Sequence, residues 1–254
     1  MARDVSSVLN SMRQSAPGPS GLRADHLLLA FRGGYADSLM RVLQSIMNGR
    51  APRWLADARL LAIPKKDGGI RPIAVGEVLR RLASAALIRG SKSQLPPLGR
   101  QFILRRDGCL SVVSLVRASL MGDRSLCALT VDLRIAFNSV KRSAVLSAAS
   151  GTMISAYAQW AYGKPSNLRF GQYVISSSSG VQQGDPAGPV LFSMALDSCL
   201  ATARQTFSRD VLDLWYTDDG ILLGVREEVI KTFDLLSEPL HFADLTINEE
   251  KCLL

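Results

Sequence analysis

The order of apolar and polar residues along the chain predicts alternating helices and strands. Apolar residues recur at helical spacing in some segments and form short β-prone runs in others. The predicted helices cover residues 5–12, 26–47, 76–88, 136–149 and 186–203. The predicted strands cover residues 59–63, 70–75, 126–131, 173–176, 211–216 and 221–225. The sequence therefore predicts a mixed α+β fold.

Two pairs of predicted strands are joined by short turns rich in glycine and aspartate. KKDGG separates 59–63 from 70–75, and Thr217-Asp218-Asp219-Gly220 separates 211–216 from 221–225. Such turns between apolar runs are typical of β-hairpins. The sequence shows no internal repeat, low-complexity tract or linker, so no clean boundary between independent domains is expected.

Composition and charge point to an anionic partner. The 254 residues are 47% hydrophobic, which is enough for a substantial core, and 30 Lys and Arg outnumber 22 Asp and Glu to give a net charge of +8. Many of the basic residues fall between positions 65 and 106. Nucleic acid or an anionic membrane surface would suit this charge, and an ordinary solvated basic surface is the alternative.

Cysteine usage and hydropathy favour an intracellular protein. The four cysteines are widely spaced, and with two histidines they argue against a zinc site or a disulfide scaffold. We find neither a signal peptide nor a run of about 18 apolar residues, so the sequence predicts no secretion and no membrane span.

Three aspartates are the strongest candidates for chemistry. Asp218 and Asp219 are adjacent in a predicted hairpin turn, where like charges repel, and Asp132 ends the predicted strand LCALTVD. Three carboxylates at one sheet edge are the oxygen ligands that two Mg²⁺ ions use in phosphoryl transfer. An ordinary β-turn and a helix cap at Asp132 are the structural alternatives.

Two further segments suit phosphate or nucleotide binding. GVQQGDPAGP, at 180–189, places glycines before a long helix, and IPKKDGGIRPI, at 63–73, projects Lys65, Lys66 and Arg71 from a hairpin. Each is also compatible with a simple turn.

Taken in order, IPKKDGGIRPI, VDLRIAFNSV, GVQQGDPAGPVLF, YTDDG and LTINEEKC resemble the fingers and palm motifs of reverse transcriptases. APGPSG, at 16–21, is similar to an upstream signature of non-LTR retrotransposon enzymes. The resemblance covers about residues 15–251. It implies a right-hand polymerase fold with an antiparallel palm sheet packed on helices. It also implies one reverse transcriptase domain over 1–254, with 15–125 mainly fingers and 126–254 mainly palm, and with some interleaving of fingers segments.

The resemblance also assigns roles to individual residues. It makes Asp132, Asp218 and Asp219 the catalytic metal ligands, with the backbone carbonyl of Leu133 beside them. The residues that it places at the incoming nucleotide, template or leaving group are Lys65, Arg71, Phe137, Gln183, Gly184 and Lys251. Phe137 would exclude a 2′-hydroxyl and so favour deoxynucleotides, unless it belongs only to the core.

The implied activity is RNA-directed DNA synthesis. Its cofactors would be two Mg²⁺ or Mn²⁺ ions, and its partners an RNA template, a nucleic-acid primer and deoxynucleoside triphosphates, without a membrane. A eukaryotic non-LTR element would place the protein in the nucleus. The sequence leaves the oligomeric state, natural template and host element open.

Several positions depart from the family pattern. Thr217 precedes the paired acids where a small or aliphatic residue is usual, Asp244 replaces a glycine, and Ser20 replaces an acid. Arg134 and Ile135 replace a more common polar and small pair. Because the sequence ends soon after LTINEEKC, we expect no thumb, RNase H or endonuclease segment within it. Two alternatives therefore stand beside the polymerase: a catalytically weak or inactive nucleic-acid-binding remnant, and an RNA-dependent RNA polymerase, against which Phe137 argues.

Overall fold

The computed structural model describes residues 2–65, 68–96 and 98–254, so Lys66 of the predicted hairpin tip lies outside the described residues. The chain forms two compact units. The first contains residues 1–95 and 149–188, and the second contains residues 96–148 and 189–254. The limits of fingers and palm expected from the sequence stay a prediction, because compactness alone assigns neither name.

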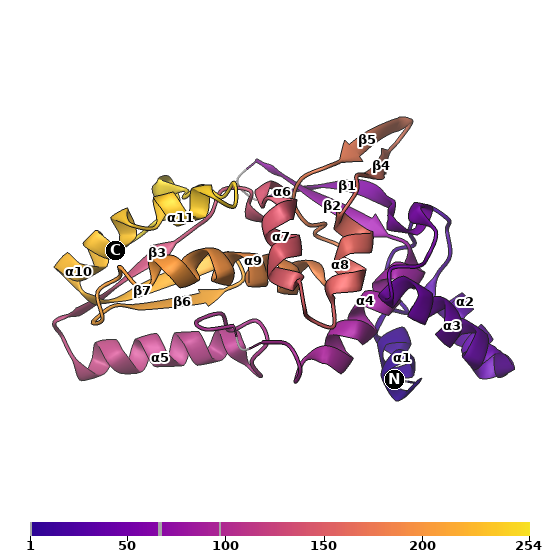
Figure 1. Cartoon of the computed structure of the whole chain (residues 1–254), viewed down its shortest axis with the longest axis horizontal. Helices are drawn as coiled ribbons and strands as arrows, with labels where there is room; N and C mark the ends of the chain where they lie inside the picture. Colours follow the sequence, from indigo (N-terminus) through magenta and orange to yellow (C-terminus); the bar gives the residue numbers. More distant parts are fainter. Residues whose placement is uncertain (1, 66–67, 97) are drawn as a thin grey trace. The chain divides into compact units, whose positions relative to one another are not determined.

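The first unit combines a four-stranded sheet with helices (Figure 1). The strand order is β2-β1-β4-β5, in which only β1 and β4 are parallel. Its strands are β1 (Ala58–Pro64), β2 (Ile70–Gly76), β4 (Ser166–Phe170) and β5 (Tyr173–Ser177). Its helices are α1 (Ala2–Ser11), α2 (Ala24–Ala30), η1 (Phe31–Tyr35), α3 (Ala36–Met47), η2 (Arg53–Ala56), α4 (Val78–Ser91) and α8 (Ser155–Tyr162).

The second unit is built on a three-stranded antiparallel sheet with the order β3-β7-β6 (Figure 1). Its strands are β3 (Leu126–Val131), β6 (Leu212–Tyr216) and β7 (Asp219–Val225). Its helices are α5 (Gly108–Gly122), α6 (Ala136–Ser139), α7 (Arg142–Ala149), α9 (Gly188–Ala203), α10 (Arg226–Asp234), α11 (Ser237–His241) and η3 (Glu249–Lys251), with residues 149 and 188 counted in the first unit. Helix α5 packs against β3 and β6, and α10 packs against β3 and β7.

Helix α9 is the most apolar helix of the second unit and lies in its core. Phe192, Leu196 and Leu200 are fully buried. A helix that is apolar on most of its faces is stable only when neighbouring elements cover it. Pro189 stands in its first turn, where a missing N–H breaks no helical hydrogen bond.

The structure confirms both predicted hairpins and all six predicted strands to within two residues at each end, but two predicted helices are wrong in extent. The helix predicted over 26–47 is interrupted at Gly33 and Gly34, where Gly34 takes a φ of +92° that a helix cannot continue. The helix predicted over 136–149 is two helices, because the chain is extended at Val140, where ψ is 128°. Periodicity alone did not reveal α5, α8, α10, α11 or β4.

No helix in the described ranges combines the length and the apolar character needed to cross a bilayer.

Candidate active site

One end of the β3-β7-β6 sheet gathers the three predicted aspartates. Val131 of β3 pairs with Gly220 of β7, so Asp132 and Asp219 follow this pair on neighbouring strands. Asp219 in turn pairs with Tyr216 of β6, which leaves Thr217 and Asp218 as the two residues of the turn. The hairpin pairing therefore places one single and two consecutive carboxylates at the same end of the sheet.

Asp132 is held by a residue from the C-terminal segment. The backbone N–H of Asn248 donates to the carbonyl of Asp132 at 2.8 Å, and its Nδ2 donates to Oδ2 of Asp132 at 2.9 Å. Leu133 is buried and forms an isolated antiparallel β-bridge with Ile247. The segment after α11 thus fixes both the backbone and the side chain of Asp132.

The turn that carries Asp218 and Asp219 rests on a buried tryptophan. The Trp215 side chain is fully buried, and its indole Nε1 donates to Oδ2 of Asp213 at 3.2 Å. A Cβ atom added at Gly220 would lie 2.6 to 2.8 Å from three carbons of the Trp215 ring. Gly220 is therefore required by close packing, and the glycine of YTDDG has a steric reason.

The carboxylates influence one another electrostatically. Partial burial of its carboxyl raises the pKa of Asp219 above its ordinary value, and the charges of Asp218 and Asp132 raise it further. The residue as a whole remains exposed. A cation placed between these groups would relieve the repulsion.

The donor set fits a divalent cation that brings part of its own coordination shell. Within the described residues, no group of three or more His, Cys, Asp and Glu side chains could hold a metal ion by itself. The three aspartates share one end of the sheet, and substrate phosphates and water would have to complete the coordination of an ion. Mg²⁺ is commonly held in this manner, by one or two carboxylates with water and substrate phosphates as the other ligands.

Two other predicted residues lie in the same unit. Phe137, on α6, is half-buried and stacks on Phe192 of α9, with ring centroids 4.8 Å apart and planes inclined by 21°. Lys251 ends η3 and is exposed. The structure gives Phe137 a core partner, and its role toward a sugar stays a prediction.

The remaining predicted residues belong to the first unit. Lys65 follows β1 and Arg71 pairs with Ile63 across the hairpin, and both side chains are exposed. Gly184 lies against the carbonyl of Ala74 on β2, where a Cβ atom would clash with backbone. Gln183 is half-buried beside it. These placements leave the predicted contacts with nucleotide and template untested.

A buried polar network holds the loop that carries Gln183 and Gly184. The Arg80 guanidinium donates to Oδ2 of Asp185 at 2.9 Å and to Oε1 of Gln182 at 2.7 Å. Tyr157 and Tyr162 donate to the same Asp185 oxygen at 2.8 and 2.6 Å. Burial acts to raise the pKa of Asp185, but the Arg80 charge and these hydrogen bonds leave that pKa below its usual value.

Sequence reasoning missed Asn248 and the Arg80–Asp185 pair. Asn248 lies inside LTINEEKC and Asp185 lies inside GVQQGDPAGP, so both residues fall within motifs that the sequence had singled out. Their partners are distant in the sequence, at 132 and 80. Side-chain pairing across such separations is set by the fold and cannot be read from local patterns.

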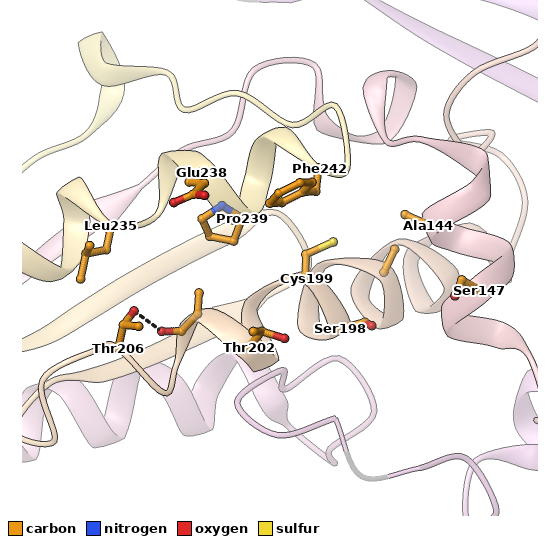
Figure 2. A pocket seen from close by; sticks show the side chains of 12 residues that line it. Ala144, Ser147, Ser198, Cys199, Thr202, Thr206, Leu235, Glu238, Pro239 and Phe242 are labelled. Atoms are coloured by element: carbon orange, nitrogen blue, oxygen red, sulfur yellow. Dashed lines mark hydrogen bonds between the residues drawn. The ribbon is translucent and has the colours of Figure 1, made fainter.

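A cavity in the second unit is separate from the aspartates. It measures about 590 Å³ and is lined by small and apolar side chains of α7, α9, α11 and the residues around them (Figure 2). Figure 2 shows Cys199, Pro239 and Phe242 among these side chains. None of the predicted site residues lines it.

Comparison with known proteins gives a consistent result. The sequence model of the family described as reverse transcriptase (RNA-dependent DNA polymerase) matches residues 63–254. A Pol polyprotein of the type-1 retrotransposable element R2 from Nasonia vitripennis is 25% identical over 99% of this chain and 26% of its own length. Its counterpart from the R2DM element of Drosophila melanogaster is 27% identical over 94% of this chain and 24% of its own length. The chain thus spans about a quarter of these relatives.

Solved structures support the fold. Apo telomerase from Candida tropicalis, truncated from its C-terminal domain, aligns with 80% of this chain and 50% of its own at a TM-score of 0.57 and 13% identity. Candida tropicalis telomerase in complex with a TWJ fragment of telomeric RNA aligns with 80% of this chain and 41% of its own, at a TM-score of 0.60 and 11% identity. The expected right-hand polymerase fold is confirmed.

Proposed function

The chain belongs to the reverse transcriptase family, and on that premise we propose that it is the RNA-directed DNA polymerase core of a non-LTR retrotransposon. The reaction is attack of a primer 3′-hydroxyl on the α-phosphate of a deoxynucleoside triphosphate. The observation that carries the proposal is the gathering of Asp132, Asp218 and Asp219 at one end of the β3-β7-β6 sheet, where partial burial and then the charges of the other two raise the pKa of Asp219.

Reverse transcriptases generally use divalent metal ions, and we propose two Mg²⁺ or Mn²⁺ ions for this chain. Asp132, Asp218 and Asp219 would hold them, with the carbonyl of Leu133 alongside. When bound, such ions stabilise the charge that develops on the attacking and leaving oxygens. The chain contributes the positions of its carboxylates, which Asn248 and the hairpin turn fix before any substrate arrives.

The other predicted residues would handle the substrates. Lys65 and Arg71 would contact the triphosphate, because a lysine supplies a point charge and an arginine a planar fork. Gln183 and Gly184 would lie against nucleotide and template, and Lys251 would neutralise the pyrophosphate leaving group. An RNA template with a nucleic-acid primer is the proposed partner, and the net charge of +8 favours such a polyanion.

Primer extension tests this proposal directly. The purified chain, given an RNA template, an annealed DNA primer and deoxynucleotides, is expected to extend the primer in Mg²⁺ or Mn²⁺ and to stop when EDTA is added. Extension on a gel, read with and without the metal, is the measurement. Binding without extension in either metal, with affinity that falls steeply as salt rises, would favour the inactive remnant instead. A preference for ribonucleotides would favour the RNA polymerase.

A smaller side chain at Phe137 is expected to weaken discrimination between the two sugars. Phe137→Val removes an aromatic ring and opens space, so ribonucleotide incorporation relative to deoxynucleotide incorporation should rise roughly tenfold or more. The ratio of kcat/KM for the two nucleotides is the measurement. Phe242→Val, at an exposed phenylalanine of the same unit, is the matched control and should leave the ratio unchanged. An unchanged ratio in Phe137→Val would assign Phe137 to the core alone.

A further inference from the structure

The residue before the paired acids has a strained backbone. Thr217 takes a φ of +57°, in the left-handed region that β-branched residues rarely adopt. Such a conformation persists only where the surrounding structure holds it, and it is found most often at functional sites. Thr217 is also the position at which this chain departs from the small or aliphatic residue usual in its family.

A buried glutamine forms hydrogen bonds with both the backbone carbonyl and the backbone N–H of this strained residue. Nε2 of Gln101 donates to the carbonyl of Thr217 at 2.7 Å, and the N–H of Thr217 donates to Oε1 of Gln101 at 3.1 Å. Gln101 is 2% exposed. Its amide therefore satisfies one backbone donor and one backbone acceptor within the turn.

The backbone of Gln101 is itself fixed. The N–H of Trp215 donates to the carbonyl of Arg100 at 2.9 Å, and the N–H of Phe102 donates to the carbonyl of Trp215 at 2.8 Å. Gln101 thus forms an isolated parallel β-bridge with Trp215 of β6. These two hydrogen bonds tie the backbone on both sides of Gln101 to β6.

Thr217 passes this constraint to the neighbouring carboxylate. Its Oγ1 lies 2.9 Å from Oδ1 of Asp218 and 2.6 Å from the carbonyl of Tyr216. A hydroxyl carries one proton, so it donates to one of these acceptors at a time. Donation to an ionised carboxylate is the charge-assisted alternative and orients Asp218.

We infer that Gln101 and Thr217 form a clamp that orients the Asp218 carboxylate for metal binding. Gln101 is a positioning residue, since it acts on Asp218 only through Thr217. The inference rests on the proposed function, in which Asp218 is a metal ligand. It adds two residues, Gln101 and the hydroxyl of Thr217, that the family motifs did not assign.

Direct metal binding is the primary test. Gln101→Met keeps the length of the side chain and removes both hydrogen bonds, and Mn²⁺ affinity is measured by electron paramagnetic resonance of unbound Mn²⁺ without substrates. Removing groups that orient metal ligands typically weakens affinity or activity by about 10- to 100-fold, and we expect a loss in this range. The kcat for primer extension should fall with the affinity, while KM for the deoxynucleotide stays unchanged. Gln205→Met, at an exposed glutamine of the same unit, is the matched control.

Two variants at Thr217 distinguish loss of the hydroxyl that orients Asp218 from a general loss of folding. Thr217→Ser keeps the hydroxyl and should retain wild-type Mn²⁺ affinity, whereas Thr217→Val keeps the β-branched shape and should lose affinity. Equal affinity in these two variants would overturn the role of the hydroxyl. This pair also keeps the test decisive if Gln101→Met fails to fold.

Amide exchange distinguishes failure of the clamp from failure of the proposed function. Because the N–H of Thr217 donates to Gln101, its hydrogen exchange should accelerate in Gln101→Met and stay slow in Gln205→Met. If the wild type binds Mn²⁺ but extends no primer, the polymerase proposal fails while the exchange and binding results still support the clamp. Unchanged Mn²⁺ affinity in a folded Gln101→Met would overturn the clamp even if the wild type extends primers.

Discussion

Replacing Asp219 by asparagine is expected to reduce primer extension by on the order of a thousandfold, because a ligand that stabilises charge in the transition state is lost. The fold should survive, since the residue is exposed and its charge is disfavoured by partial burial of the carboxyl and by Asp218 and Asp132. Removing that repulsion should leave the free energy of unfolding unchanged or raise it by a few tenths of a kcal/mol without metal. Single-turnover extension and urea denaturation of the same preparation measure the two effects.

The pH dependence of the stability difference provides an internal check. The pKa of Asp219 is higher in the folded chain than in the unfolded chain, so this group favours folding most below its ordinary pKa. That contribution is lost as the pH rises through the raised pKa. The Asp219→Asn variant should therefore have a higher free energy of unfolding than the wild type near neutral pH, and this difference should disappear in acid. Asp234→Asn, at an exposed acid of α10, should change neither activity nor stability. Wild-type extension by Asp219→Asn would remove Asp219 from the proposed site.

The hairpin that carries the paired acids was predictable because its signal is local. Two apolar runs flank TDDG, so strand alternation and turn chemistry indicate the same structure. The sequence also located Asp132 at a strand end, since LCALTV is apolar and β-prone. The structure agrees on β3 and β6 to within a residue and begins β7 two residues early, at Asp219. What local patterns could not give is the pairing of β3 with β7, which brings the single acid to the other two.

Two departures from the family pattern have physical explanations in the structure. Asp244 stands where glycine is usual and takes a φ of +55°, a left-handed conformation that aspartate tolerates better than most residues. Ser20 stands where an acid is usual and donates from its N–H and Oγ to the buried carboxylate of Glu77, at 2.8 and 2.6 Å. An acid at position 20 would repel Glu77. The sequence alone shows neither the positive φ nor the distant partner.

The contacts that hold the aspartates were beyond the reach of sequence patterns. Gln101 forms its hydrogen bond with Thr217, and Asn248 forms its hydrogen bond with Asp132. In each pair the two residues are 116 positions apart in the sequence. Gln101 lies outside every motif named in the sequence, and the motif that contains Asn248 gives no sign of its partner. Such pairs depend on the register of the sheet and on the path of the chain after it, and both are properties of the complete fold.

Replacing Asp185 by asparagine is expected to destabilise the chain by about 3–5 kcal/mol, the usual effect of leaving a buried charge without its partner. Arg80 and Asp185 are both 1% exposed in their side chains and 2.9 Å apart. Asparagine would retain an oxygen for Tyr157 and Tyr162 but would leave the guanidinium charge uncompensated. Since total stabilities are about 5–15 kcal/mol, urea denaturation should show a large fall in the midpoint.

The location of the pair, and not the loss of a carboxylate in general, should cause this effect. Arg13 and Asp25 form an ion pair in the same unit with side chains 59% and 45% exposed, so Asp25→Asn should cost less than about 1 kcal/mol. Removing both charges with Arg80→Met and Asp185→Leu should cost less stability than the sum of the two single changes, because no unpaired charge remains.

The pKa of Asp185 is lowered in the folded chain, so its contribution to stability is present above the ordinary aspartate pKa and is lost as the pH falls through the lowered value. A loss in Asp185→Asn no larger than in Asp25→Asn would show that the loop carrying Gln183 and Gly184 is held by packing alone.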